Sequence, residues 1–186
     1  CYKTLYELVF NRIRLEKTDR LIMLGDYIDR GSMSRQVIDL IMNLQEEGYD
    51  VVPLSGNHEW MLLSSYDNHD MLPLWLMNDG QTTIESFSLD EISGFSRTYI
   101  GFFRNLKYFH REENFLFVHA GFNDEAEDPF ADREAMIWES RFSYSNPVFT
   151  NTRIIHGHRP KQLDYVRSMI SQNSQVIPID TGCVYG

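Results

Sequence analysis

Cysteine and long apolar stretches are both scarce in this sequence. Only two cysteines, at positions 1 and 183, occur in 186 residues, which excludes a disulfide scaffold and a zinc site built from thiolates. No apolar run approaches the length that crosses a membrane, and no signal peptide opens the chain. We therefore expect a cytoplasmic protein with no membrane partner.

Positive charge is also in deficit. The 17 lysines and arginines are outnumbered by 27 aspartates and glutamates, which gives a formal net charge of -10. General binding to nucleic acid needs a basic face, so we expect no nucleic-acid partner. Phosphate substrates are still compatible with this charge, because a metal ion and a few arginines can create a local positive field.

The order of apolar patterns predicts an α/β fold in one domain, residues 1–186. A helical stripe at residues 2–13 comes before any strand, and the chain ends directly after a strand and a glycine turn. We therefore expect a domain that is incomplete at both ends. A helix capped by Ser32 should end near Gly48, and helices interrupted near Pro73, Gly80 and Gly94 should fill residues 59–108. The predicted strands are residues 20–24, 51–54, 115–118, 153–155 and 176–179.

Two polar strings follow apolar runs. Gly25-Asp26-Tyr27-Ile28-Asp29-Arg30-Gly31 comes after the first predicted strand, and Gly56-Asn57-His58-Glu59 comes after the second. A buried strand that ends in acids and a base is typical of a reaction centre at the carboxyl edge of a sheet.

Four predicted strands are followed by a side chain that can bind a metal. These side chains are those of Asp26, Asn57, His119 and His158. Because parallel strands bring their carboxyl ends to one edge, we expect the four to meet there. A carboxylate, an amide oxygen and two imidazoles suit a divalent ion such as Mn²⁺, Fe²⁺ or Zn²⁺.

The chain resembles the calcineurin-like metallophosphoesterases of the phosphoprotein phosphatase group. The matching strings are those at residues 25–31 and 56–59, with Val118-His119-Ala120-Gly121 and Gly157-His158. Residues 75–80, 138–141 and 180–186 resemble bacterial members, symmetrical diadenosine tetraphosphatases among them. The resemblance implies a sandwich of two mixed sheets flanked by helices.

The resemblance also implies a role for each matching residue. Asp26 would bridge two divalent metal ions, usually Mn²⁺, with Asn57, His119 and His158 as the other ligands of one ion. His58 would donate a proton to the leaving group, oriented by Asp29, because an imidazolium beside a carboxylate stays protonated longer. Phosphate oxygens would be bound by guanidinium groups, which grip them with fixed geometry; the two matching residues are Arg30 and Arg141.

The family's first motif, Asp-x-His-Gly, which supplies the remaining ligands of the other ion, is not in its expected place. Cys1 looks like the residue that would follow it, and Asp67-Asn68-His69 lies in a polar break and is not expected to bind metal.

The first hypothesis is a metal-dependent phosphatase acting on phosphoserine or phosphothreonine in proteins. The alternatives are a dinucleotide polyphosphate hydrolase of the diadenosine tetraphosphatase type and a non-catalytic module that binds a phosphorylated ligand. Glu59 is interpreted as a structural residue of its loop, His110 as a loop residue and His156 as a strand residue.

Overall fold

The computed structural model describes residues 2–183, so Cys1 and residues 184–186 lie outside the description. The six strands are β1 (Arg20–Met23), β2 (Asp50–Pro53), β3 (Phe109–Glu112), β4 (Phe115–Val118), β5 (Arg153–His156) and β6 (Val176–Pro178). The α-helices are α1 (Tyr2–Tyr6), α2 (Ser34–Glu46), α3 (Asn57–Asp67), α4 (Leu72–Leu76), α5 (Gly80–Ser86), α6 (Arg97–Arg104), α7 (Arg133–Trp138) and α8 (Leu163–Ser171). A π-helix, η1 (Glu7–Arg12), continues α1, and short 3₁₀ turns form η2 (His69–Met71), η3 (Ile92–Gly94) and η4 (Pro147–Phe149). Within the part described, no helix combines the length and the apolar character needed to cross a membrane.

The strands form two sheets, which confirms the predicted α/β class. β1 and β2 pair in parallel, and β3-β4-β5-β6 form a mixed sheet in which only β3 runs antiparallel to its neighbour. The interpretation of His110 as a loop residue was wrong, because it lies on β3 opposite Phe117. The segment Phe109-His110-Arg111-Glu112 is short and largely polar, so its apolar pattern does not mark it as a strand.

The predicted helices between residues 59 and 108 are confirmed, with differences at their ends. Gly80 begins α5 and Gly94 ends η3, as expected of breaks, but Pro73 lies in the first turn of α4, where proline is tolerated. The prediction that Ser32 caps the next helix was wrong. The N-cap of α2 is Met33, without a side-chain cap, and the Ser34 hydroxyl instead donates to the carbonyl of Gly31.

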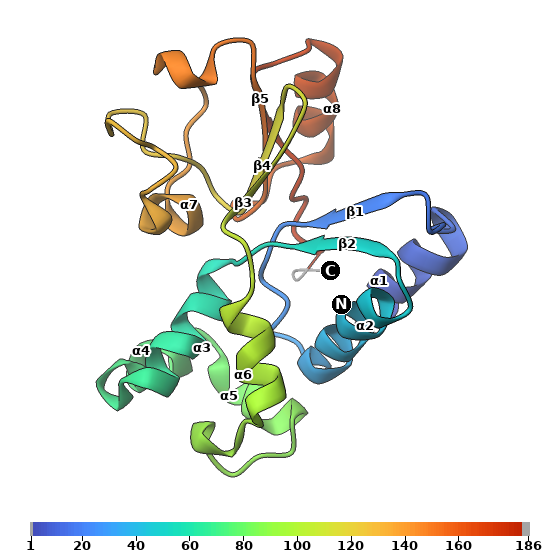
Figure 1. The fold of residues 1–186 in the computed structure, drawn as a ribbon, viewed down its shortest axis with the longest axis vertical. Helices are drawn as coiled ribbons and strands as arrows, with labels where there is room; N and C mark the ends of the chain where they lie inside the picture. Colours follow the sequence, from blue (N-terminus) through green and yellow to red (C-terminus); the bar gives the residue numbers. More distant parts are fainter. Residues whose placement is uncertain (1, 184–186) are drawn as a thin grey trace.

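Figure 1 shows β1 and β2 lying next to the sheet that contains β3, β4 and β5. The buried apolar side chains form two clusters, one with each sheet. One packs α2 to α6 against β1 and β2, and its fully buried side chains include Ile38, Ile41, Leu62, Trp75 and Phe103. The other fills the space under β4, β5 and β6; its buried side chains include Leu116, Phe122, Met136, Phe149 and Ile154. Each cluster holds its own sheet rigid, so the strand ends between them are supported from both sides.

The contact between α4 and α5 depends on the absence of a side chain at Gly80. A Cβ there would lie 2.5 Å from Cδ2 of the Trp75 indole, which is fully buried. Gly80→Ala should therefore lower the free energy of unfolding by about 1–3 kcal/mol, the usual cost of overpacking. Urea denaturation measures the change.

A matched control is available in α6. A Cβ at Gly101 would meet no atom within 4 Å, so Gly101→Ala should stabilise the helix by about 0.5–1 kcal/mol. Equal effects of the two substitutions would contradict the packing explanation.

Candidate metal centre

The loop after β1 is built from residues in left-handed backbone conformations. Gly25 has a φ of 100°, and Asp26, Asp29 and Arg30 have φ values of 57°, 67° and 58°. Left-handed backbone is uncommon outside glycine, and functional sites are where such strain concentrates. These turns reverse the chain within a few residues, which places the two carboxylates of the string in different surroundings.

Glu59 joins this loop to the loop after β2. Its Oε2 accepts hydrogen bonds from the backbone N–H groups of Asp26, at 2.9 Å, and Gly56, at 2.8 Å, and its Oε1 accepts one from Tyr27 at 2.7 Å. The carboxylate is fully buried, and burial together with the charge of Asp26 raises its pKa to about 7, against the effect of the backbone N–H groups. The sequence interpretation of Glu59 as a partner within its own loop was incomplete, because two of its three bonds cross to the other loop.

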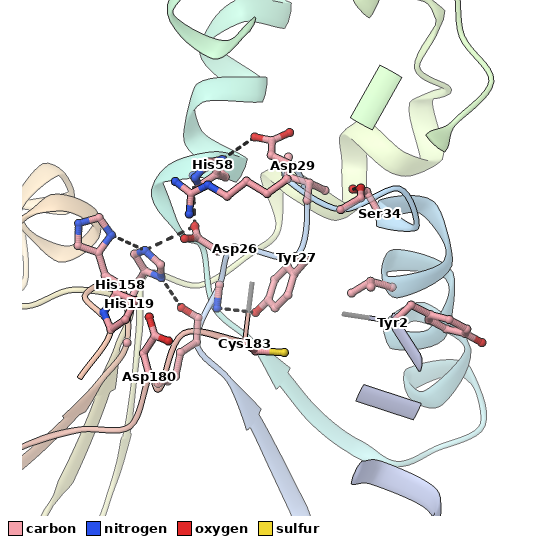
Figure 2. A pocket seen from close by; sticks show the side chains of 18 of the residues that line it. Tyr2, Asp26, Tyr27, Asp29, Ser34, His58, His119, His158, Asp180 and Cys183 are labelled. Carbon is pink, nitrogen blue, oxygen red and sulfur yellow. Dashed lines mark hydrogen bonds and ion pairs between the residues drawn. The ribbon is translucent and has the colours of Figure 1, made fainter. Parts of the chain in front are cut away.

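The four predicted ligands come together. Nε2 of His119 lies 3.1 Å from Oδ1 of Asn57, 3.1 Å from Nδ1 of His158 and 3.5 Å from Oδ1 of Asp26. The ligand atoms of Asp26, His119 and His158 all lie within 4.8 Å of one another (Figure 2). The four strand ends belong to two different sheets that face each other, and not to one edge of a single sheet as the sequence predicted.

The chemistry of these atoms fits a cation. Nδ1 of His119 lies 2.7 Å from the carbonyl of Leu24 and must donate its proton there, which leaves Nε2 with a lone pair directed at the other three ligands. Burial and the neighbouring His119 lower the pKa of His158 to about 4, so its imidazole is neutral at pH 7. A divalent ion bound between these lone pairs would relieve the repulsion among them.

Two other carboxylates, those of Asp67 and Asp180, have the chemistry of metal ligands. Asp67 is exposed and pairs with Arg104. Asp180, which the sequence reasoning missed, lines the same cavity as Asp26 and accepts a hydrogen bond from the N–H of Gly182 (Figure 2). It follows β6 closely, so the strand-end rule that found the other four residues would also have found Asp180.

Asp29 and His58 form a buried acid–base pair. Nδ1 of His58 lies 2.6 Å from Oδ2 of Asp29, and the two side chains are 1 % and 0 % exposed. Asp29 also accepts hydrogen bonds from the indole of Trp75, at 2.9 Å, and the hydroxyl of Thr83, at 2.6 Å. The side chain of Asp29 is thus fixed by residues of α4 and α5, and no local sequence pattern pointed to these two partners.

His58 is held ready to donate a proton from its other nitrogen. Burial alone would lower the pKa of His58, but the hydrogen bond to Asp29 and the charges of Asp26 and Glu59 raise it above its ordinary value. Its Nε2 is buried and has no hydrogen-bond partner among the described residues. An imidazole with one nitrogen fixed by a carboxylate and the other unpartnered suits a general acid.

The two predicted phosphate-binding arginines lie in different places. Arg30 is exposed and lines a cavity of about 490 Å³ together with Asp26, His58, His119 and His158. Arg141 does not line this cavity. It pairs with Glu139 at 2.5 Å and Glu125 at 3.6 Å and borders a second, smaller cavity, so its phosphate-binding role stays a prediction.

Four candidate metal ligands next to a His58–Asp29 pair are the arrangement expected of a metal-dependent hydrolase. A family model for the calcineurin-like phosphoesterases matches residues 1–177, and the chain belongs to that family. Among curated proteins, no sequence matches significantly.

Two solved structures share the fold. One, described as a “putative diadenosine tetraphosphatase”, is 17% identical with a TM-score of 0.61, and the match covers 97% of this chain and 79% of that one. The other is a metallophosphoesterase from Sphaerobacter thermophilus, 16% identical with a TM-score of 0.51, covering 83% and 54%. At these identities the likeness concerns the fold alone.

Asp26→Asn should release bound metal and abolish turnover together, because it removes the negative charge among the four ligands. The metal affinity should fall by more than the roughly 10- to 100-fold that loss of an outer-shell partner costs. Elemental analysis of the dialysed protein measures the metal. Asp67→Asn is the matched control and should keep its full metal content.

Glu59→Gln should weaken both the fold and the metal site. Its amide NH₂ would face backbone N–H donors, which should cost about 1–3 kcal/mol in unfolding free energy and about 10- to 100-fold in metal affinity. Urea denaturation and metal titration measure the two effects. Glu46→Gln, at an exposed position of α2, should change neither, and unchanged metal affinity in Glu59→Gln would show that the two loops keep their places without the carboxylate.

Proposed function

We propose that this phosphoesterase hydrolyses phosphoserine and phosphothreonine in proteins, with His58 as the proton donor to the leaving oxygen. The observation that supports the proposal is the His58–Asp29 pair, because Nε2 of His58 has no hydrogen-bond partner among residues 2–183. A serine or threonine alkoxide is a poor leaving group. A positioned acid therefore accelerates its departure more than that of an acidic leaving group.

The proposal gives each residue of the site one role: metal binding, phosphate binding or proton donation. Asp26, Asn57, His119 and His158 would hold a divalent metal, which supplies positive charge for the phosphoryl oxygens and lowers the pKa of bound water. Arg30 binds a phosphoryl oxygen from the open side of the cavity. A water oxygen bonds to phosphorus and releases one proton to solvent while the P–O bond to the substrate breaks. Nε2 of His58 gives its proton to the departing oxygen and is reprotonated from solvent.

The proposal includes two metal ions, with Mn²⁺ as the preferred ion, and a cytoplasmic location. Two ions are proposed because the carboxylate of Asp26 has two oxygens. Mn²⁺ is proposed because oxygen and imidazole ligands suit it. Within residues 2–183 the candidate group of Asp26, His119 and His158 is the only one of its kind. Metal stoichiometry in the active protein tests this part of the proposal.

A second candidate substrate is a dinucleoside polyphosphate. The fold neighbour described as a diadenosine tetraphosphatase raises it, and a cavity beside His158 that is lined by cationic side chains favours it. The same acid and metal residues would serve both reactions.

His58→Ala should lower kcat by about 10² to 10⁴ on a phosphoserine peptide, the usual span for a lost general acid. The loss should be much smaller on an aryl phosphate, whose leaving group needs no proton. Steady-state kinetics on both substrates measure the difference.

The control is His69→Ala, at an exposed position in η2, which should retain wild-type rates on both. If His58→Ala kept wild-type turnover on the peptide, His58 would have no part in proton transfer.

A further inference from the structure

Two of the four candidate metal ligands are histidines, and their rings are held in different ways. Nδ1 of His119 donates to the carbonyl of Leu24, which fixes the rotation of that ring. Within residues 2–183, His119 is the only hydrogen-bond partner of the His158 imidazole. A metal-binding histidine usually has its second nitrogen fixed by a carboxylate or a carbonyl. The ring of His158 therefore needs another contact to stay in place.

The backbone around His158 fixes the position of the residue but not the rotation of its ring. The N–H of Gly157 donates to the carbonyl of His119 at 2.8 Å, which ties the end of β5 to the end of β4. His158 itself has a left-handed backbone, with a φ of 67°. Neither feature acts on the side-chain torsions, each of which has several staggered or broad minima.

Trp138 supplies the missing contact. The centroids of its ring and the His158 ring are 6.0 Å apart, and the two planes are perpendicular. An edge-to-face arrangement is favoured between aromatic rings, and it depends on their orientation. Trp138 is the last residue of α7, and in the same helix the carbonyl of Met136 accepts a hydrogen bond from the N–H of Ala120 at 2.9 Å. The tryptophan is therefore anchored next to the residue that follows His119.

A second tryptophan braces the first from the other sheet's helices. The rings of Trp60 and Trp138 are 6.4 Å apart between centroids and meet at 82°. Trp60 lies in the first turn of α3, the turn that begins with Asn57. Both tryptophans pack against the hydrophobic cluster of α2 to α6. The three rings thus form a row that connects the helix carrying Asn57 to the segment carrying His158.

The two tryptophans lie outside the cavity that holds the site. His58 and His158 line this cavity of about 490 Å³, and neither Trp60 nor Trp138 does. A ring that does not line the cavity can influence the centre only through the side chain that it contacts. The chemistry of the row is therefore positioning and not catalysis.

We propose that Trp138 is a positioning residue of the metal centre: its indole, braced by Trp60, keeps the His158 ring in the rotation that directs Nδ1 at the site shared with His119. This inference rests on the proposed assignment of His158 as a metal ligand and is independent of the substrate. A ligand ring that is already ordered loses less freedom when the ion binds, so the contact raises metal affinity.

Trp138→Leu and Trp138→Phe test the role of the ring through Mn²⁺ affinity, measured by calorimetry. Leucine removes the aromatic contact and should lower the affinity about tenfold, the lower end of the loss for an outer-shell partner. Phenylalanine keeps a ring and should restore the affinity to within about threefold of wild type. At saturating Mn²⁺, KM for an aryl phosphate should stay within about twofold in both, because substrate binding is unaffected.

Phe102→Leu is the matched control. Phe102 is also partly buried, packs against the same cluster and forms an edge-to-face pair with Phe103, but it does not line the metal cavity. Phe102→Leu should lower stability in urea and leave Mn²⁺ affinity unchanged. A loss of affinity confined to Trp138→Leu is thus separate from a general weakening of the core.

A double-mutant cycle tests the part played by Trp60. Trp60→Leu alone should lower Mn²⁺ affinity about threefold, the size of one aromatic pair. In the Trp138→Leu background it should cause no further loss, because the brace acts only through the indole that it contacts. Additive losses would overturn the bracing role.

The visible absorption of bound Co²⁺ provides a readout without turnover, because it depends on the coordination geometry. The spectrum should change in Trp138→Leu, return toward wild type in Trp138→Phe and stay unchanged in Phe102→Leu. Wild-type Mn²⁺ affinity in Trp138→Leu, or equal losses in the leucine and phenylalanine variants, would overturn the positioning role and leave the phosphoesterase activity intact. A wild-type protein that binds neither ion would instead overturn the metal site, and this inference with it.

Discussion

The functional architecture depends on one buried carboxylate. Glu59 accepts three backbone N–H bonds, one from its own loop and two from residues more than thirty positions before it in the chain. These bonds hold the turn that presents Asp26 against the start of α3, which presents Asn57 and His58. Because one carboxylate accepts from backbone groups of both loops, a single side chain can hold the strained loop after β1 against the start of α3. The hydroxyl of Tyr27, between the carbonyls of Met23 and Leu54, links the same strand ends a second time.

The helical layer serves the chemistry as well as the core. Trp75 on α4 and Thr83 on α5 both donate to Asp29, so the acid that orients His58 is itself oriented by helices that lie far along the chain. Trp75 contributes to both the core and the site. Its ring is fully buried, and its indole N–H donates to Asp29. Positioned groups of this kind need their supporting contacts as much as their own side chains.

The four candidate metal ligands could be located from the sequence because each follows an apolar run that forms a strand, although these strands belong to two sheets and not to one. Asp26, Asn57, His119 and His158 were found in this way. The partners of Asp29 could not be predicted, since Trp75 and Thr83 are joined to it only by the tertiary fold. Polar β3 and the uncapped start of α2 escaped detection because local patterns there are weak. Arg141 was chosen as the arginine that follows Trp138, but Glu139 and Glu125 engage its guanidinium in the structure.

The hydrogen bond from His119 to the carbonyl of Leu24 has a consequence for the apo protein. His119 belongs to the end of β4 and Leu24 to the end of β1, so one metal ligand takes its orientation from the opposite sheet. Binding of an ion and packing of the two sheets against each other are therefore thermodynamically linked. A ligand present at a hundred times its dissociation constant adds about 2.7 kcal/mol to native-state stability, and here that contribution acts on the seam between the sheets. Chelation would accordingly loosen this seam before it disturbs either hydrophobic cluster.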